Sequence, residues 1–165
     1  MTTDTATFPP ESVRAEIEEL LTHYPPERKD AALIPLLLIV QRVRNHISDE
    51  TAVEVARYLD IPEQRVLGVV TFYTMLFRKP VGENVIWHCK TLSCHLRGAR
   101  ACLDAMRAKL GIEPGETTPD GKFTLLVTEC LGLCELAPAA LVNDDRYVNL
   151  TPARVEQMLD ERGAG

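Results

Sequence analysis

Two pairs of cysteines constrain most strongly how this chain can fold. Cys89 and Cys94 enclose Lys-Thr-Leu-Ser, whereas Cys130 and Cys134 enclose Leu-Gly-Leu. Each pair begins where a short apolar run ends, as expected for loops that leave the strands of one sheet. Gly132 lets the backbone turn tightly inside the second pair. If both loops leave the same edge, four thiolates come together, which is the number that a 2Fe–2S cluster needs.

Three other interpretations of these cysteines stay open on the residues alone. Zinc also takes four thiolates, but its ligand pairs usually enclose two residues, against four and three here. The cysteines would otherwise be unconnected core residues, since free cysteine is often buried. A dithiol redox site is the weakest alternative, because the chain contains no Cys-x-x-Cys.

Three residues near the cysteine pairs are predicted not to be ligands. Cys102 shares helical spacing with Met106 and Leu110, which predicts core packing. His88 and His95 flank the first pair, and histidine does bind iron in some clusters. Because four cysteines already suffice, we interpret both histidines as residues of the surface or of the surroundings of the site.

Residues 11–76 follow the period of α-helices, and four helices are expected. Three of the apolar faces consist of Val13, Ile17, Leu20 and Leu21; of Leu33, Leu37, Val40 and Val43; and of Val66, Val69, Val70 and Tyr73. Asp30 is predicted to cap the second helix, and Ser48 begins the third. Pro62 fits the first turn of the fourth. Nothing in this helical bundle looks catalytic.

After residue 82 the pattern changes to that of a small α/β domain. The predicted elements are a strand at 85–88, a helix at 96–110, a strand at 123–127, a hairpin with strands at 140–142 and 146–149, and a closing helix after Thr151-Pro152. Residues 111–121 contain two prolines and three glycines, so they are predicted to form a loop. We therefore expect an N-terminal helical bundle at 1–80 and a second domain at 81–165.

Charge and composition narrow the classes of function. The chain of 165 residues has a formal net charge of −6 and no basic cluster, which argues against a nucleic-acid binder. No secretory signal is predicted at residues 1–10, and the longest apolar run, 31–40, is too short to span a bilayer. We expect a soluble, cytoplasmic protein whose cysteines serve metal or redox chemistry, because the cytosol keeps thiols reduced.

The segments around the cysteines also resemble a known family. The resemblance lies in Cys89-Lys-Thr-Leu-Ser-Cys94-His-Leu-Arg-Gly98-Ala, Pro119-Asp-Gly-Lys-Phe123, Glu129-Cys130-Leu-Gly-Leu-Cys134, Ala137-Pro138, Val142-Asn-Asp-Asp145, Leu150-Thr-Pro152 and Val70-Thr-Phe-Tyr-Thr74. These segments are similar to the thioredoxin-like 2Fe–2S ferredoxin family. Its members are the small ferredoxin subunit of respiratory complex I and relatives in NAD-linked formate dehydrogenases and hydrogenases.

The resemblance implies an α/β fold in which a helical bundle precedes a thioredoxin-like domain. That domain would hold one 2Fe–2S cluster through Cys89, Cys94, Cys130 and Cys134. The implied function is electron transfer in an NADH:quinone oxidoreductase, by exchange of single electrons with the FMN of a partner subunit that binds NADH. Further iron–sulfur subunits would belong to the same complex, and membrane association, at the cytoplasmic face of the inner membrane, would come only through that complex.

The chain should not be catalytic alone, because it carries no Gly-rich dinucleotide fingerprint after a strand. One alternative is the corresponding subunit of a soluble NAD-dependent formate dehydrogenase or hydrogenase. An alternative of another class is a zinc-stapled adaptor domain, which would be colourless where an iron–sulfur protein is red-brown. A thiol–disulfide enzyme lacks the motif that it would need.

Overall fold

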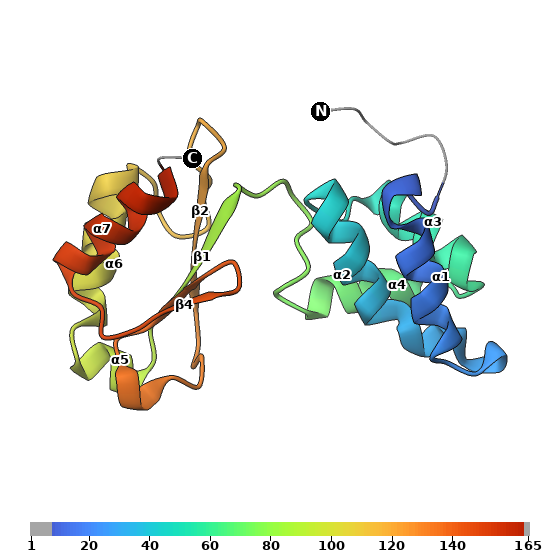
Figure 1. The fold of residues 1–165 in the computed structure, drawn as a ribbon, viewed down its shortest axis with the longest axis horizontal. Coiled ribbons are helices and arrows are strands. Elements are labelled where there is room, and N and C mark those ends of the chain that lie inside the picture. The colour runs from blue at the N-terminus through green and yellow to red at the C-terminus, as the bar shows by residue number, and fades with distance from the viewer. Residues whose placement is uncertain (1–7, 164–165) are drawn as a thin grey trace. The chain divides into compact units, whose positions relative to one another are not determined.

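A computed structural model of the chain describes residues 8–163. The chain divides into two compact units, Met1–Pro80 and Val81–Gly165, which are drawn in Figure 1 and described separately below. In the described part of the chain, no helix is both long enough and apolar enough to cross a membrane.

The first unit is helical. Its elements are the 3-10 helix Glu11–Val13, α1 (Arg14–Thr22), the 3-10 helix Pro26–Ala32, α2 (Leu33–Arg44), α3 (Asp49–Leu59) and α4 (Glu63–Phe72). The breaks between them follow local sequence signals. Helix α1 ends shortly before Pro25 and Pro26, which lack the N–H that a helix interior requires. Helix α3 begins at Ser48 as predicted, and Ser48 caps it, because its hydroxyl accepts a hydrogen bond from the N–H of Thr51.

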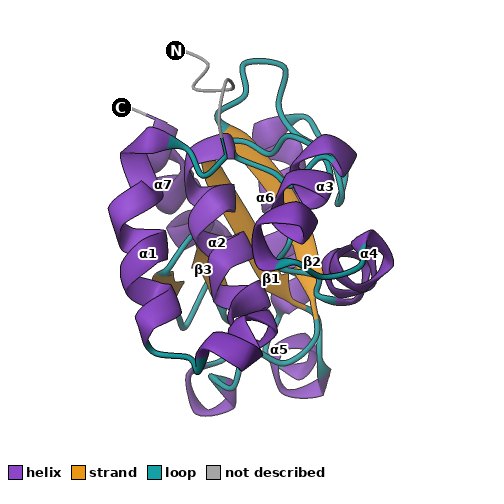
Figure 2. Ribbon diagram, turned by 90° about the vertical axis from the view of Figure 1, so that its right-hand side faces the viewer, coloured by secondary structure: helices purple, strands orange, loops and turns teal. Residues whose placement is uncertain are grey.

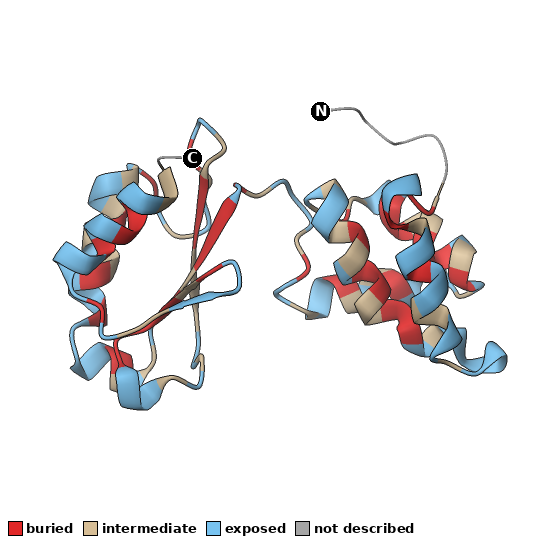
Figure 3. Cartoon of the chain, viewed as in Figure 1, coloured by how far each residue is buried: buried red, intermediate tan, exposed pale blue. Residues whose placement is uncertain are grey.

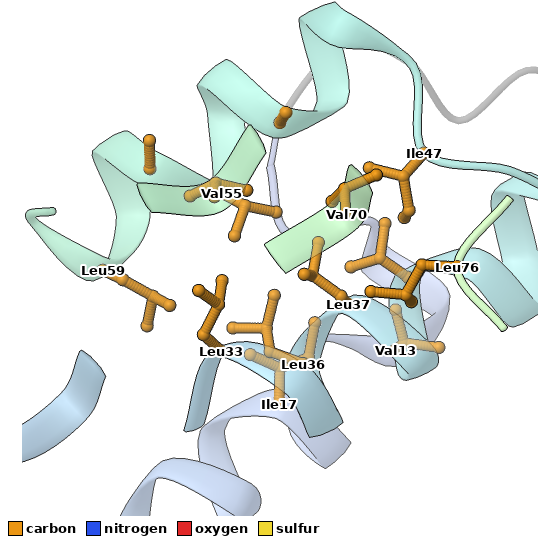
Figure 4. Close-up of a cluster of buried hydrophobic side chains, with 14 residues drawn as sticks. Val13, Ile17, Leu33, Leu36, Leu37, Ile47, Val55, Leu59, Val70 and Leu76 are labelled. Carbon is orange, nitrogen blue, oxygen red and sulfur yellow. The ribbon is translucent and has the colours of Figure 1, made fainter. Parts of the chain in front are cut away.

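The core of this unit is formed by the apolar stripes of its helices. Its buried residues are Val13, Ile17, Leu33, Leu36, Leu37, Val40, Ile47, Ala52, Val55, Ala56, Leu59, Val66, Val70 and Leu76 (Figure 4). The prediction for Val43 is wrong, because this side chain is 43% exposed. The stripe of α2 runs instead through Leu36, Leu37 and Val40, all fully buried.

The predicted starts of two helices also need correction. Asp30 does not cap α2, since the chain continues as a 3-10 helix up to Ala32 and no side chain caps α2. The Asp30 carboxylate instead accepts hydrogen bonds from Arg28 at 3.3 Å and from Arg65 at 2.7 Å. Pro62 is the N-cap residue of α4, one position before the first turn.

The second unit has a four-stranded sheet with helices on one face. Its elements are β1 (Asn84–Cys89), α5 (Leu92–Leu96), α6 (Ala99–Leu110), β2 (Phe123–Thr128), the 3-10 helix Cys134–Leu136, β3 (Ala140–Val142), β4 (Asp145–Tyr147) and α7 (Pro152–Gly163). The strand order is β2-β1-β3-β4 (Figure 2). Strands β1 and β2 are parallel, whereas β3 runs antiparallel to both β1 and β4.

Helices α6 and α7 cover the same face of this sheet, and the burial colours of Figure 3 mark their inner sides. Between the helices and the sheet lie Ile86, Cys102, Met106, Ile112, Phe123, Leu125, Ala140, Val142, Leu150, Val155, Met158 and Leu159. The core therefore joins both central strands to both long helices. It holds β1 and β2 side by side, so it also determines where the loops at their ends begin.

The helix predicted at 96–110 is in fact two helices, α5 and α6. Gly98 interrupts it with φ = +97°, a left-handed backbone that side chains with a Cβ rarely adopt. Helix α6 begins after this glycine, at Ala99. The short helix α5 begins earlier than expected, at Leu92. The second cysteine of the first pair, Cys94, thus lies inside α5.

Candidate metal centre

The parallel pairing of β1 and β2 brings the two cysteine loops to one edge of the sheet. Cys89 is the last residue of β1 and lies opposite Thr128, the last residue of β2. Cys130 follows two residues later. Because parallel strands end at the same edge, both loops leave the sheet side by side.

The four thiols of these loops form two neighbouring pairs. The sulfurs of Cys130 and Cys134 lie 3.3 Å apart. Cys89 and Cys94 influence each other's ionisation, and Cys134 interacts electrostatically with both of them. Within residues 8–163, no three His, Cys, Asp or Glu side chains converge as a site for one ion requires. A 2Fe–2S cluster distributes four thiolates over two irons, and two neighbouring pairs of thiols fit that donor set.

The pairs differ in their exposure to solvent. Cys89 and Cys94 are buried, at 1% and 2% exposure, whereas Cys130 and Cys134 are exposed. The apolar surroundings consist largely of small or partly buried side chains, namely Ala99, Ala137, Ala139, Leu131, Leu133 and Val148. One side of the candidate centre is therefore dry and the other faces outward.

Within each pair, one thiol has a lowered pKa and the other a raised one. Burial opposes ionisation of Cys89, but hydrogen bonds from Thr91 and Cys94 outweigh it and lower the pKa. Burial, together with the bond to Cys89, raises the pKa of Cys94 to about 11. The N–H of Gly132 lowers the pKa of Cys130, and the bond to Cys130 raises that of Cys134. In each pair, one thiol is thus easier to deprotonate than the other, and a bound metal requires both as thiolates.

Hydrogen-bond donors of both loops reach the sulfurs. The Gly132 N–H lies 3.3 Å from Cys130 Sγ, and Gly132 has φ = +76°. The hydroxyl of Thr91 lies 3.1 Å from Cys89 Sγ. The hydroxyl of Ser93 favours ionisation of Cys134. The turn at Gly132 agrees with the sequence, but the two hydroxyls were not predicted, because the helix that contains Ser93 was expected to begin only at 96.

Arg97 is a further residue that the sequence analysis missed. Its Nε donates to the carbonyl oxygen of Ala137 at 2.8 Å and so ties the first cysteine loop to the second. An arginine three residues after Cys94 is the only signal for it in the sequence, and that signal has no specificity.

The other residues singled out in the sequence lie outside the thiol group. Cys102 is buried in the core under α6 and α7, as predicted. His95 is exposed. His88 is only 1% exposed and is therefore no surface residue. Because successive strand residues face opposite sides, its ring lies on the helix side, with Nε2 3.0 Å from the carbonyl oxygen of Ala99.

The chain is similar to one described family over most of its length. The family "Thioredoxin-like [2Fe-2S] ferredoxin" matches residues 17–162. An NADH-quinone oxidoreductase subunit of Rickettsia bellii is 43% identical over 145 residues, which cover 87% of this chain and 87% of that protein. The equivalent subunit of the NADH-quinone oxidoreductase of Escherichia coli K12 is 42% identical over 147 residues, covering 89% and 87%.

A solved structure resembles the chain in three dimensions. It is that of an NAD+-reducing [NiFe]-hydrogenase in the air-oxidized state, with a TM-score of 0.70 and 25% sequence identity. The match covers 81% of this chain but only 23% of the hydrogenase chain. The chain therefore corresponds to a part of that larger protein.

Proposed function

This chain belongs to the thioredoxin-like 2Fe–2S ferredoxin family, and we propose that it is the electron-transfer subunit of an NADH:quinone oxidoreductase. The observation that carries the proposal is the gathering of four thiols at one sheet edge. They lie in a chain 42–43% identical to proteins that are named as subunits of NADH-quinone oxidoreductase.

In this proposal Cys89, Cys94, Cys130 and Cys134 hold one 2Fe–2S cluster. Such a cluster takes up and releases one electron at a time. The protein supplies four thiolates, the dry side around Cys89 and Cys94, and the donors of Thr91, Ser93 and Gly132. The exposed thiols of Cys130 and Cys134 mark the side that electrons reach first.

The partner in this proposal is a subunit that binds FMN and NADH. A flavin receives two electrons as a hydride and must release them singly to iron–sulfur centres, so a one-electron site beside it is useful. Apolar side chains on the cysteine loops support a docking surface, since Leu92, Leu96 and Leu136 are 71%, 75% and 39% exposed. The chain is then an enzyme only as part of the oxidoreductase, and further iron–sulfur subunits complete the complex.

The ferredoxin segment of an NAD-linked hydrogenase is the second candidate. The structural match to the NAD+-reducing hydrogenase favours it. That match has 25% identity, whereas the quinone oxidoreductase subunits reach 42–43% and align along 87% of their own length. Sequence similarity therefore supports the quinone-linked complex more strongly.

The test is analysis of the full chain purified without oxygen. We expect about two irons and about two acid-labile sulfides per chain, with the red-brown absorbance of a 2Fe–2S protein. Isolation of the untagged native complex should also bring down a flavoprotein. Stoichiometric zinc with no visible absorbance would contradict the proposal and support the zinc-stapled adaptor.

A further inference from the structure

Thr91 occupies the N-cap position of α5 without capping it. Its backbone has φ = −73° and ψ = 169°, the extended conformation of an N-cap residue, yet no side chain caps the helix. Two other hydroxyl residues of the chain do cap. Ser48 accepts from the N–H of Thr51 at 3.2 Å, and Thr151 accepts from the N–H of Arg154 at 3.3 Å. The hydroxyl of Thr91 is thus directed elsewhere.

That hydroxyl reaches a thiol of the first cysteine loop. Its oxygen lies 3.1 Å from Cys89 Sγ. Cys89 is only 1% exposed, so this contact is on the buried side of the thiol group.

The chemistry of a ligand sulfur determines which partner donates. A cysteine bound to iron is a thiolate and has no proton, so only the Thr91 O–H can donate in this contact. Uptake of one electron makes the cluster more negative, and a donor at its sulfur stabilises the reduced form more than the oxidised one. The proton stays on the threonine oxygen, so the uptake of one electron by the cluster is the only net change.

We propose that Thr91 is a positioning residue that raises the reduction potential of the cluster by donating its hydroxyl hydrogen to the ligand sulfur of Cys89. The proposal rests on the proposed function, because it needs a cluster at these thiols. The backbone N–H of Gly132 has the same role at Cys130 in the second loop, where it lies 3.3 Å from Sγ.

The test compares the midpoint potentials of the full chain and its variants by redox titration followed by EPR. Thr91→Val keeps the branched shape and removes the donor. We expect the ratio of reduced to oxidised protein at a fixed ambient potential to fall by about tenfold, equivalent to about 59 mV for one electron. Thr91→Ser keeps the hydroxyl and should restore the parent potential. Thr91→Ala is a second variant without the hydroxyl and should behave as Thr91→Val does.

Thr71→Val is the matched control. The Thr71 hydroxyl bonds the carbonyl oxygens of Leu67 and Gly68 in its own helix, within the first unit, so its loss should leave the potential unchanged. A parent protein without a 2Fe–2S signal would overturn the proposed function itself. If the parent holds a cluster, an unchanged potential in Thr91→Val and Thr91→Ala overturns the role of Thr91. Loss of the cluster from both of these variants also overturns it, because the hydroxyl would then be needed for assembly and not for tuning.

Discussion

At the residue scale, the five cysteines differ in surroundings more than in chemistry. Cys102 is enclosed by core side chains such as Met106 and Val155, and burial raises its pKa. The other four thiols contact each other or hydroxyl and N–H donors at the sheet edge. A thiolate ligand must lose its proton, so burial without donors argues against ligation by Cys102.

This difference predicts how cysteine variants behave. Cys102→Ala should keep the visible and EPR spectra of the cluster, because the lost sulfur only packs. Cys130→Ala, which alters an exposed side chain of similar size, should bleach the protein by removing a proposed ligand. Absorbance and iron content of the two variants, purified in parallel, provide the measurement. Loss of the cluster in Cys102→Ala alone would show that the ligands are assigned wrongly.

Gly132 is the second residue with a testable role. A Cβ at this position would meet nothing within 4 Å, so a substitution acts through the backbone, whose φ is +76°. Gly132→Ala should cost about 1–2 kcal/mol of strain. We expect the loop to relax that strain by moving the N–H away from Cys130 Sγ, which lowers the midpoint potential or shortens the lifetime of the cluster.

Gly115→Ala is the control for strain alone. Gly115 has φ = +97°, equally open surroundings, and a place in the loop between α6 and β2. It should destabilise the fold to a similar extent without changing the potential. If the parent and Gly132→Ala have equal potentials and equal cluster lifetimes, Gly132 serves only to turn the backbone and does not tune the cluster.

At the element scale, helix α2 shows that only part of an apolar stripe in the sequence is buried in the core. Leu37 and Val43 both fit the apolar stripe expected from the sequence, yet Leu37 is fully buried and Val43 is 43% exposed. Leu37→Ala should lower the free energy of unfolding of the helical unit by about 2–5 kcal/mol, because it leaves a cavity. Val43→Ala should change it by about 0.5 kcal/mol or less. Urea titration followed by circular dichroism measures both, and equal effects would contradict the assigned core.

At the scale of the whole molecule, the chain shares its family and most of its length with subunits of NADH-quinone oxidoreductase. The family and its relatives confirm the predicted fold class, with a helical segment before a thioredoxin-like ferredoxin domain. We expect the isolated chain neither to bind NADH in calorimetry nor to reduce dyes with it. Activity should appear when the flavin-bearing subunit is added. NADH oxidation by the isolated, flavin-free chain would contradict the proposed division of labour.

The sequence by itself determined the features that depend on near neighbours in the chain. Most helices and strands, the start of a helix at Ser48 and the loop at 111–121 were predicted, because each depends on a few consecutive residues. The resemblance carried by the cysteine segments led to the right family for the same reason.

Only the tertiary structure decided which of these features meet. Parallel pairing of β1 and β2 brings the two cysteine loops to one edge of the sheet. There Arg97 of the first loop bonds Ala137 of the second, 40 residues further along the chain. Packing of α6 on the sheet buries His88, for which the sequence had left a place on the surface or in the surroundings of the site open. The cap position of Thr91 predicts a bond to its own helix, but the hydroxyl bonds the thiol of Cys89 instead. A side chain that could bond either a local or a distant partner bonds the distant one only when the fold brings that partner close. Neighbouring residues in the sequence do not show which partner the fold brings close.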